Sequence, residues 1–406
     1  MNSVNMEKIT GGITAVSGID AAGVKCGIKK NGDSDLALIY SREPAAAAGV
    51  FTRNKFKAAP LIVTERHISN PTVSAIVINS GNANACTGDQ GIKDALSTAE
   101  IVAGKLGLRR EDVLVASTGV IGHYLPMERL SLGIDKAVEK LSPKGGEDAA
   151  RAIMTTDTVI KESACRVQLD GEQGFFTIGG MAKGSGMICP DMATMLAFVA
   201  TDVKIKKEAL QKSLQEAVER SFNVITVDGD TSTNDMVLVI SNGTSEIEVE
   251  EDGDLWHVFN ESLLHVCQDL AYKIVVDGEG ATKVIKVTVK GSPDYETGKK
   301  LARSILNSPL VKTAFFGEDA NWGRIITAMG NADVHFIPDQ VDIYLGKMQV
   351  TARGKGLVFD ESEAKAILMQ TEIPVLVDLN MGLEEVISYG CDLSYDYIRI
   401  NADYRS

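Results

Sequence analysis

The sequence predicts an α/β fold with mixed sheets and packed helices. Two patterns in its 406 residues indicate this class: short apolar runs of strand length, and longer segments in which apolar residues recur at every third or fourth position. A chain of this length exceeds the usual size of a single hydrophobic core. Since 44% of the residues are hydrophobic, we expect two or more globular domains.

The predicted strands are runs of apolar and β-branched residues between turn-forming residues. In chain order they cover residues 74–78, 113–116, 195–200, 236–240, 284–289, 341–345, 375–379 and 397–400. All are far shorter than the ~20 apolar residues of a membrane-spanning helix, so no membrane span is expected. The polar stretch 242–254 is the nearest thing to a linker, and we interpret its flanks as a hairpin within one domain.

The predicted helices carry apolar residues at helical spacing. Three such faces are formed by Leu210, Leu214, Val218 and Phe222; by Leu263, Leu264, Cys267, Leu270, Ala271 and Ile274; and by Leu301, Ala302, Ile305 and Leu306. Asp360 suits the N-cap of a fourth helix that runs to Met369, because its carboxylate can accept hydrogen bonds from the free N–H groups of a first turn.

Charge and composition exclude several classes of function. A net charge of −14 disfavours binding to nucleic acid and to anionic membranes. Residues 1–10 are polar and lack the apolar core of a secretory signal, so we expect a cytoplasmic protein. The six cysteines are scattered without a C-x-x-C pair, which favours reduced thiols over disulfides or a zinc site, and no metal is expected.

The most informative stretch, residues 183–196, places Thr194 between a glycine-rich loop and a predicted buried strand. A threonine hydroxyl is a poor nucleophile at neutral pH. If the peptide bond between Ala193 and Thr194 is cut, however, the new α-amine, with an ordinary pKa of roughly 8, can serve as the base for its own Oγ. Thr194 would then supply both nucleophile and base.

Four turn regions rich in small and polar residues follow strand signals, where open α/β sheets collect ligands. Residues 79–88 form either Asx turns bonded to their own backbone or an amide-rich pocket wall, and the sequence leaves both open. Residues 116–122 combine a hydroxyl with small residues, so that donors could converge on a developing oxyanion.

The other two turn regions favour structural interpretations. Residues 227–235 resemble the oxygen-ligand runs of Ca²⁺ and Mg²⁺ sites but lack the spacing and distal glutamate of an EF-hand, which favours a structural turn or pocket loop. Residues 316–324 suit a helix N-terminus, where acidic side chains complement the helix dipole.

Taken together, these segments resemble the glutamate N-acetyltransferase, or ornithine acetyltransferase, family of the cyclic arginine pathway. The matching motifs extend over essentially the whole chain and cover residues 79–88, 117–122, 154–158, 183–196, 226–235, 277–283, 316–324 and 401–406. The sequence around the proposed cut, residues 192–196, is the most specific of them.

The resemblance implies Ntn-hydrolase-like chemistry on an ornithine-acetyltransferase-type fold. It implies self-cleavage into an α chain of residues 1–193 and a β chain of residues 194–406, assembled as an α₂β₂ heterotetramer. Thr194 would take the acetyl group of N-acetyl-L-ornithine, release L-ornithine, and pass the acetyl group to L-glutamate in a ping-pong reaction. We favour the bifunctional form of the family, in which acetyl-CoA is a second acetyl donor, and expect no other cofactor.

The resemblance also assigns roles to individual residues. Thr118 and Gly119 match the oxyanion-hole pair, through a side-chain hydroxyl and a backbone N–H respectively. The positions that match its substrate-binding residues are Thr156, Lys183, Thr194, Glu279, Asn401 and Ser406.

These assignments carry physical expectations. Lys183 would neutralise a carboxylate that acetylornithine and glutamate share, and Glu279 would pair with the side-chain ammonium of ornithine. Thr155 and Thr158 leave the choice of hydroxyl around Thr156 open. The tail with Asn401 and Ser406 would have to fold over the pocket after the predicted strand 397–400.

Two rival functions use the same residues. The first is a threonine-nucleophile amidase or aminopeptidase, in which water takes the acyl group. The second is a non-catalytic protein that binds a small molecule, in which Thr194 is a core residue and the chain stays uncut.

Overall fold

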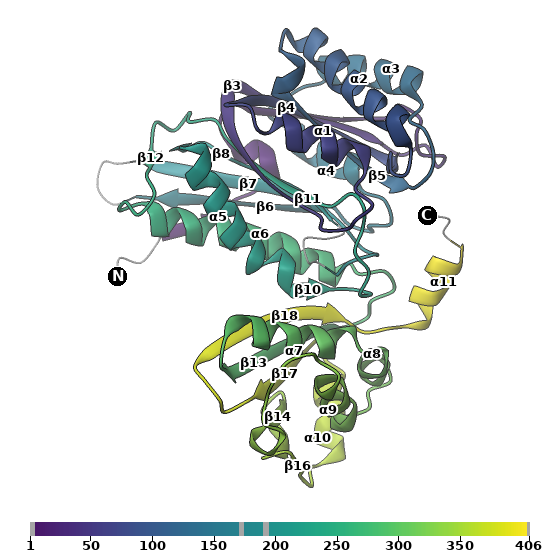
Figure 1. Ribbon diagram of the computed structural model, residues 1–406, viewed down its shortest axis with the longest axis vertical. Helices are drawn as coiled ribbons and strands as arrows, with labels where there is room; N and C mark the ends of the chain where they lie inside the picture. The colour runs from purple at the N-terminus through teal and green to yellow at the C-terminus, as the bar shows by residue number, and fades with distance from the viewer. Residues whose placement is uncertain (1–4, 170–173, 190–194, 404–406) are drawn as a thin grey trace.

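The computed structural model describes residues 5–169, 174–189 and 195–403, and these form two bodies, each built on a sheet (Figure 1). In this part of the chain nine strands make the first sheet, in the order β1-β6-β7-β8-β11-β3-β4-β5 with β2 paired to β3. Seven strands make the second, in the order β10-β18-β13-β17-β14-β15-β16. Among the described helices, none has both the length and the apolar character needed to cross a bilayer.

The first body contains β1 (Asn5–Lys8), β2 (Ile19–Val24), β3 (Leu36–Phe51), α1 (Ala59–His67), β4 (Val73–Asn82), α2 (Gly88–Leu106), β5 (Val113–Val120), α3 (Met127–Glu139), α4 (Gly146–Ile153), β6 (Lys161–Gln168), β7 (Phe175–Lys183), β8 (Leu196–Thr201), β9 (Lys204–Ile205), α5 (Lys207–Glu219), β11 (Met236–Ser241), β12 (Glu248–Val249) and α6 (Trp256–Val276). The second body contains β10 (Ile225–Thr226), β13 (Val284–Ser292), α7 (Tyr295–Asn307), α8 (Pro309–Phe316), α9 (Trp322–Gly330), β14 (Asp342–Leu345), β15 (Met348–Ala352), β16 (Lys355–Gly356), α10 (Glu361–Leu368), β17 (Glu372–Asp378) and β18 (Glu384–Cys391), and α11 (Tyr395–Asp403) follows it.

The first body has helices outside two facing halves of its sheet. The long strand β3 joins the halves, because it pairs with β2 and β4 along one part of its length and with β11 along the other. Helices α2 and α3 pack on one outer face and α5 and α6 on the other, while the inner faces meet with α4 between them. This confirms the predicted α/β class with mixed sheets and packed helices.

Burial on both faces explains the apolar run in β8. Leu196, Phe198 and Ala200 face the core between the two halves, whereas Ala197 and Val199 face α5 and α6. A strand covered on both sides needs apolar residues at every position rather than at alternate ones. The uninterrupted run in the sequence therefore predicted the strand correctly.

Side-chain caps fix the helix starts of the second body. Asp294, Ser308, Asn321 and Asp360 each accept a backbone N–H in the first turn of α7, α8, α9 and α10 respectively. These bonds satisfy donors that the helix itself leaves unpaired. They confirm the predicted Asp360 cap and the predicted helix start within residues 316–324, but the first turn of α9 contains no acidic residue, because Glu318 and Asp319 precede the cap.

Two sequence predictions are wrong. Residues 397–400 form part of the helix α11, because the Ser394 hydroxyl accepts the backbone N–H groups of Asp396 and Tyr397 and so starts a helix. The flanks of residues 242–254 do not form a hairpin: β11 before them pairs with β8 and β3, and the segment leads into α6.

Candidate active site

The two turn motifs after β4 and β5 lie side by side. These strands are parallel neighbours, and their register pairs Ser80 with Thr118 and Gly81 with Gly119. The carboxyl ends of parallel strands meet at one edge of a sheet, so the hydroxyl of Thr118 and the backbone of Gly119 sit at this edge. Two segments that are distant in the sequence thus form one wall.

Gly119 is required by the close approach of the two strands. Its φ is 130°, and a Cβ there would lie 2.4 Å from the carbonyl carbon of Gly81 and 2.5 Å from the backbone nitrogen of Asn82. Any side chain would therefore force these strand ends apart. The backbone of Gly119 can be packed this tightly only because the residue is glycine.

Asparagines at this edge bind neighbouring segments of the chain. Asn79 accepts the Ser117 hydroxyl at 2.6 Å and donates to the Asn82 carbonyl at 2.8 Å. Asn234, from the loop before β11, donates to the carbonyls of Ala83 (2.6 Å) and Ser117 (2.8 Å). Of the two interpretations that the sequence left open, these bonds support the structural one.

Lys183, the last residue of β7, is buried beside Thr118. Its Nζ donates to the Thr118 hydroxyl oxygen at 3.4 Å, and 7% of the residue is exposed. Burial lowers the pKa of Lys183, and the negative charges of Asp157 and Glu279 oppose that shift. In the sheet Lys183 pairs with Leu196, the first residue of β8, so β8 begins beside it.

A buried ion network, which sequence reasoning missed, lies beneath Lys183. The fully buried Lys161 places its Nζ 2.7 Å from Asp157 Oδ1 and 2.6 Å from Asp277 Oδ2. Asp157 also accepts the backbone N–H of Gly184 at 2.6 Å. Although burial raises the pKa of Asp157, the charges of Lys183 and Lys161 and its hydrogen bonds lower it to about 2.

This network connects three segments that carry proposed substrate residues. Asp157 follows Thr156, Gly184 follows Lys183, and Asp277 lies two positions before Glu279. The sequence marked only the segments, through the motifs 154–158, 183–196 and 277–283. Nothing in the sequence showed that Lys161 would bind the carboxylates of Asp157 and Asp277.

The structure narrows the choice among the three threonines of residues 155–158. The Thr158 hydroxyl binds Asp277, and the backbone N–H of Thr155 donates to Asp157 at 2.9 Å. Thr156 is half-buried, and its hydroxyl makes no hydrogen bond to another residue that the structure describes. Thr158 is therefore already occupied, whereas the hydroxyls of Thr155 and Thr156 both remain available to a ligand.

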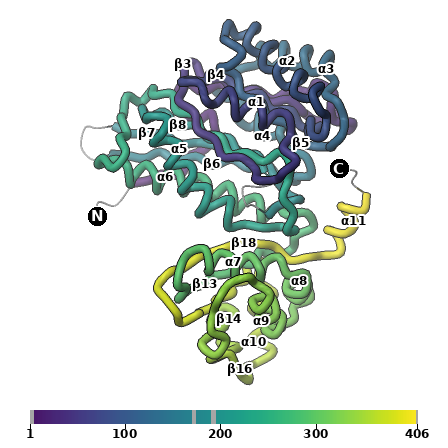
Figure 2. The backbone as a smooth tube through the Cα atoms, viewed as in Figure 1, coloured from purple at the N-terminus to yellow at the C-terminus, as the bar shows by residue number. Residues whose placement is uncertain are grey.

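Glu279 is brought to the site by a contact with α11. The residue is buried, and its Oε2 accepts a hydrogen bond from Asn401 Nδ2 at 2.8 Å. A Cβ on Gly186 would lie 2.3 Å from the Glu279 carboxyl carbon, so a side chain there would displace the Glu279 carboxylate. In Figure 2 α11 lies to the right of the second body, apart from the helices that cover its sheet.

The acidic loop 227–235 binds backbone. Asp228 accepts the N–H groups of Met187 (2.6 Å) and Ile188 (2.8 Å). Across the described residues, no group of three or more His, Cys, Asp or Glu side chains is arranged to hold a metal ion. The bonds of Asp228 to this backbone support the structural interpretation of the loop.

Three of the predicted site residues, Ala193, Thr194 and Ser406, lie outside the described residues. The nearest described residue after Thr194 is Met195, which is buried and accepts the Met236 N–H at 3.2 Å. The remaining predicted residues, Thr118, Gly119, Thr156, Lys183, Glu279 and Asn401, all belong to the connected segments described above.

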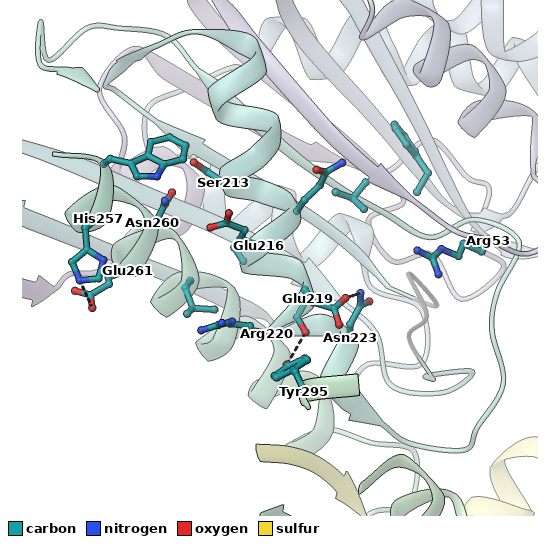
Figure 3. Close-up of a pocket in the computed structure, with 16 residues that line it drawn as sticks. Arg53, Ser213, Glu216, Glu219, Arg220, Asn223, His257, Asn260, Glu261 and Tyr295 are labelled. Carbon is teal, nitrogen blue, oxygen red and sulfur yellow. Dashed lines mark hydrogen bonds and ion pairs between the residues drawn. The ribbon is translucent and has the colours of Figure 1, made fainter. Parts of the chain in front are cut away.

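A wide groove of about 1050 Å³ runs between α5 and α6 (Figure 3). Its walls carry side chains such as Ser213, Glu216 and Asn260. None of the described residues predicted for the site lines it. The groove therefore lies apart from the described residues that were predicted for the site.

Comparison with known proteins gives a consistent result. A sequence profile of the ArgJ family matches residues 20–406. The arginine biosynthesis bifunctional protein ArgJ of Symbiobacterium thermophilum is 50% identical over 404 residues, covering 99% of this chain and 100% of that protein.

Two solved structures are also similar. The arginine biosynthesis bifunctional protein argJ of Bacillus halodurans is 43% identical with a TM-score of 0.51, and the match covers 52% of this chain and 100% of that chain. An ornithine acetyltransferase of Mycobacterium tuberculosis, solved in complex with ornithine, is 41% identical with a TM-score of 0.43, and the match covers 46% of this chain and 99% of that chain.

Proposed function

Because the chain belongs to the ArgJ family, as its motifs predicted, we propose that it moves acetyl groups through an acetyl-enzyme on Thr194. Family membership makes it a bifunctional enzyme of arginine biosynthesis, with ornithine acetyltransferase and glutamate N-acetyltransferase activities. Membership of this family therefore argues against an amidase and against a non-catalytic binding protein. The roles of the individual residues are the substance of the proposal.

The observation that carries the proposal is the convergence of Thr118, Lys183 and Glu279. Thr118 and Lys183 are in contact, and the charges of Glu279 and Asp157 act on Lys183. A potential oxyanion donor, a cation and an anion thus share one site next to the start of β8. Thr194 precedes that strand by two positions in the chain.

The reaction begins with the cut between Ala193 and Thr194. It frees an α-amine that accepts the proton of the Thr194 hydroxyl as Oγ attacks the acetyl carbon of N-acetylornithine. The solved B. halodurans chain supports a cut near the middle. The whole of that chain matches only 52% of the present protein, which is the length that one product of such a cut would have.

Thr118 and Gly119 stabilise the tetrahedral intermediate. The negative charge that develops on the acetyl oxygen accepts hydrogen bonds from the Thr118 hydroxyl and the Gly119 N–H. The C–N bond then breaks, the proton passes from the α-amine of Thr194 to the leaving amine, and ornithine departs. Glutamate enters, its amine attacks the acetyl-threonine ester, and the same groups act in reverse order.

Lys183 and Glu279 select the substrates. The Lys183 ammonium pairs with the α-carboxylate that both substrates carry, and Thr156 and Ser406 complete the pocket. Glu279, held by Asn401, pairs with the side-chain ammonium of ornithine. A charged pair of this kind in a buried pocket discriminates against uncharged analogues, since they would leave Glu279 unpaired.

The family resemblance also supports three wider proposals. The cut chains assemble as an α₂β₂ heterotetramer, acetyl-CoA is a second acetyl donor for glutamate, and the enzyme works in the cytoplasm. Comparing initial rates with acetyl-CoA and with N-acetylornithine tests the second of these directly.

Acetyl transfer itself is tested by following both fates of the acetyl group. We expect N-acetylornithine and glutamate to give ornithine and N-acetylglutamate in equal amounts. Double-reciprocal plots of the initial rate against the concentration of one substrate, at several fixed concentrations of the other, should be parallel, as a ping-pong reaction requires. Release of free acetate as the main product would show that water is the acceptor and would refute the transferase mechanism.

A further inference from the structure

Residues 184–189, the last described stretch before the proposed cut, contain one residue in a strained conformation. Met187 has a φ of 57°, a region that residues other than glycine seldom occupy. Such a conformation persists only where surrounding contacts impose it. The contacts that impose this conformation on Met187 therefore need an explanation.

Asp228 makes the central contacts. Its Oδ2 accepts the Met187 N–H at 2.6 Å, and its Oδ1 accepts the Ile188 N–H at 2.8 Å. The Tyr397 hydroxyl, on α11, donates to the same Oδ2 at 3.2 Å. Hydrogen bonds to an ionised carboxylate are the stronger kind, so Asp228 fixes two consecutive amides.

Neighbouring residues hold the carbonyls that follow. The Ile188 carbonyl accepts the Val227 N–H at 2.7 Å and the Thr226 hydroxyl at 3.0 Å. The Cys189 carbonyl accepts the Thr231 hydroxyl at 3.0 Å. The N–H and carbonyl groups of this segment are thus both bonded, and all the partners lie within residues 226–231.

The beginning of the stretch is held in the same way. The Ser185 hydroxyl donates to the Asp277 carbonyl at 2.5 Å, and the Ser185 carbonyl accepts the Glu279 N–H at 3.0 Å. Every partner named for residues 185–189 lies after position 194. After the proposed cut, all these bonds would join the end of the α chain to the β chain.

We propose that Asp228 is the centre of a cross-chain clamp, formed by Thr226, Val227, Asp228, Thr231, Asp277 and Glu279, which keeps Lys183 in the site once the chain has been cut. The inference rests on the proposed function, because only a cut creates a chain end near Lys183. Free chain ends fray unless they are tied down. Lys183 is one residue before this stretch, so fraying would withdraw the substrate-binding cation.

The clamp makes Asp228 a positioning residue with no contact to the substrate. The Ser185 carbonyl, in the same stretch, accepts the Glu279 N–H, so the clamp holds both charged substrate residues. Its loss should therefore weaken binding of N-acetylornithine and of glutamate together, while the chemistry at Thr194 and Thr118 continues.

Asp228→Asn tests the clamp, because an amide of the same shape turns an N–H₂ group toward one of the two backbone donors. Hydrogen exchange of the cut enzyme, followed by mass spectrometry, reports the amides of Met187 and Ile188. We expect their exchange to accelerate at least tenfold, the usual effect of losing a charge-assisted bond. KM for both substrates should rise about tenfold, with kcat per cut chain within about threefold of its original value.

Asp339→Asn is the matched control, since Asp339 is exposed and makes no side-chain bond within the described residues. It should leave exchange and KM unchanged. If Asp228→Asn does not fold, Thr231→Val removes one bond to Cys189 and should shift both readouts in the same direction by less.

The outcomes separate the clamp from the proposed function. A wild-type chain that remains uncut while it transfers acetyl groups overturns the proposed function. It also overturns the clamp, because without a cut there is no chain end to hold. A cut wild-type enzyme whose Asp228→Asn variant keeps normal exchange at Met187 and Ile188, or a normal KM, overturns the clamp alone.

Discussion

Replacing Lys161 with methionine tests the buried ion network. Lys161 is fully buried, and its Nζ binds Asp157 at 2.7 Å and Asp277 at 2.6 Å. Methionine is similarly long and unbranched but carries no charge. The substitution therefore leaves two carboxylates in the interior without the cation that lies between them.

The remaining contacts set the size of the effect. Removing one partner of a buried ion pair typically costs about 3–5 kcal/mol, because the other charge is left uncompensated. Asp157 keeps the Gly184 N–H and the charge of Lys183, and Asp277 keeps its bonds to Thr158. We therefore expect the free energy of unfolding to fall by about 3 kcal/mol, the lower end of that range.

Urea unfolding of the cut enzyme measures this loss. Lys30→Met is the control, because Lys30 is exposed and unpaired among the described residues, and its effect should stay within about 0.5 kcal/mol. The double variant Lys161→Met/Asp277→Asn should regain part of the loss, since it also removes one uncompensated charge.

Two results would refute this reasoning. A loss below about 1 kcal/mol in Lys161→Met would mean that the pair contributes no more than an exposed salt bridge does. A double variant less stable than the single one would mean that the uncompensated carboxylate is not the cause of the loss.

Four further predictions concern the site. Thr118→Ala should lower kcat roughly 10²–10³-fold with little change in KM, and Thr118→Ser should retain most activity; an effect confined to KM would make Thr118 a binding residue. Thr194→Ala should abolish both cutting and turnover, whereas Thr194→Ser retains some of each, as gels, N-terminal sequencing and assays would show; a new N-terminus at any other residue contradicts the proposed cut. Glu279→Gln should raise KM for N-acetylornithine more than KM for glutamate, and equal increases would exclude pairing with the ornithine ammonium. The pKa of Asp157 is lowered from 3.8 to about 2, so its ionised form should contribute about 2 kcal/mol to the free energy of unfolding above pH 4. This contribution should be lost as the pH falls from about 4 to about 2. Urea unfolding of Asp157→Asn should lack this pH dependence.

Local patterns predicted most of the fold. The apolar run of β8 is correct because both faces of the strand are buried, and Asp360 caps α10 because its carboxylate reaches two first-turn amides. Helix α6 keeps its apolar residues on one side because that side packs on the sheet. In each case a short stretch of sequence contains the interaction that decides its structure.

The failures arise where the deciding partner is distant or easily overlooked. Residues 397–400 alternate like a strand, but the Ser394 hydroxyl binds two amides of α11 and the Gly280 carbonyl, 114 positions away. Lys161 has neighbours typical of a strand residue, and only the tertiary fold brings Asp277 to it. The motifs marked the segments proposed for the site, yet they could not reveal the ion network beneath these segments.

The proposed cut would leave the first body intact for a topological reason. Strands β8 and β11, which follow position 194, lie between β7 and β3, which precede it. Separating the two chains would break the pairing of β7 with β8 and of β3 with β11, and would open the cores on both faces. The peptide bond at 193–194 is therefore dispensable for holding the fold together, and its cleavage can supply the amine that the nucleophile needs.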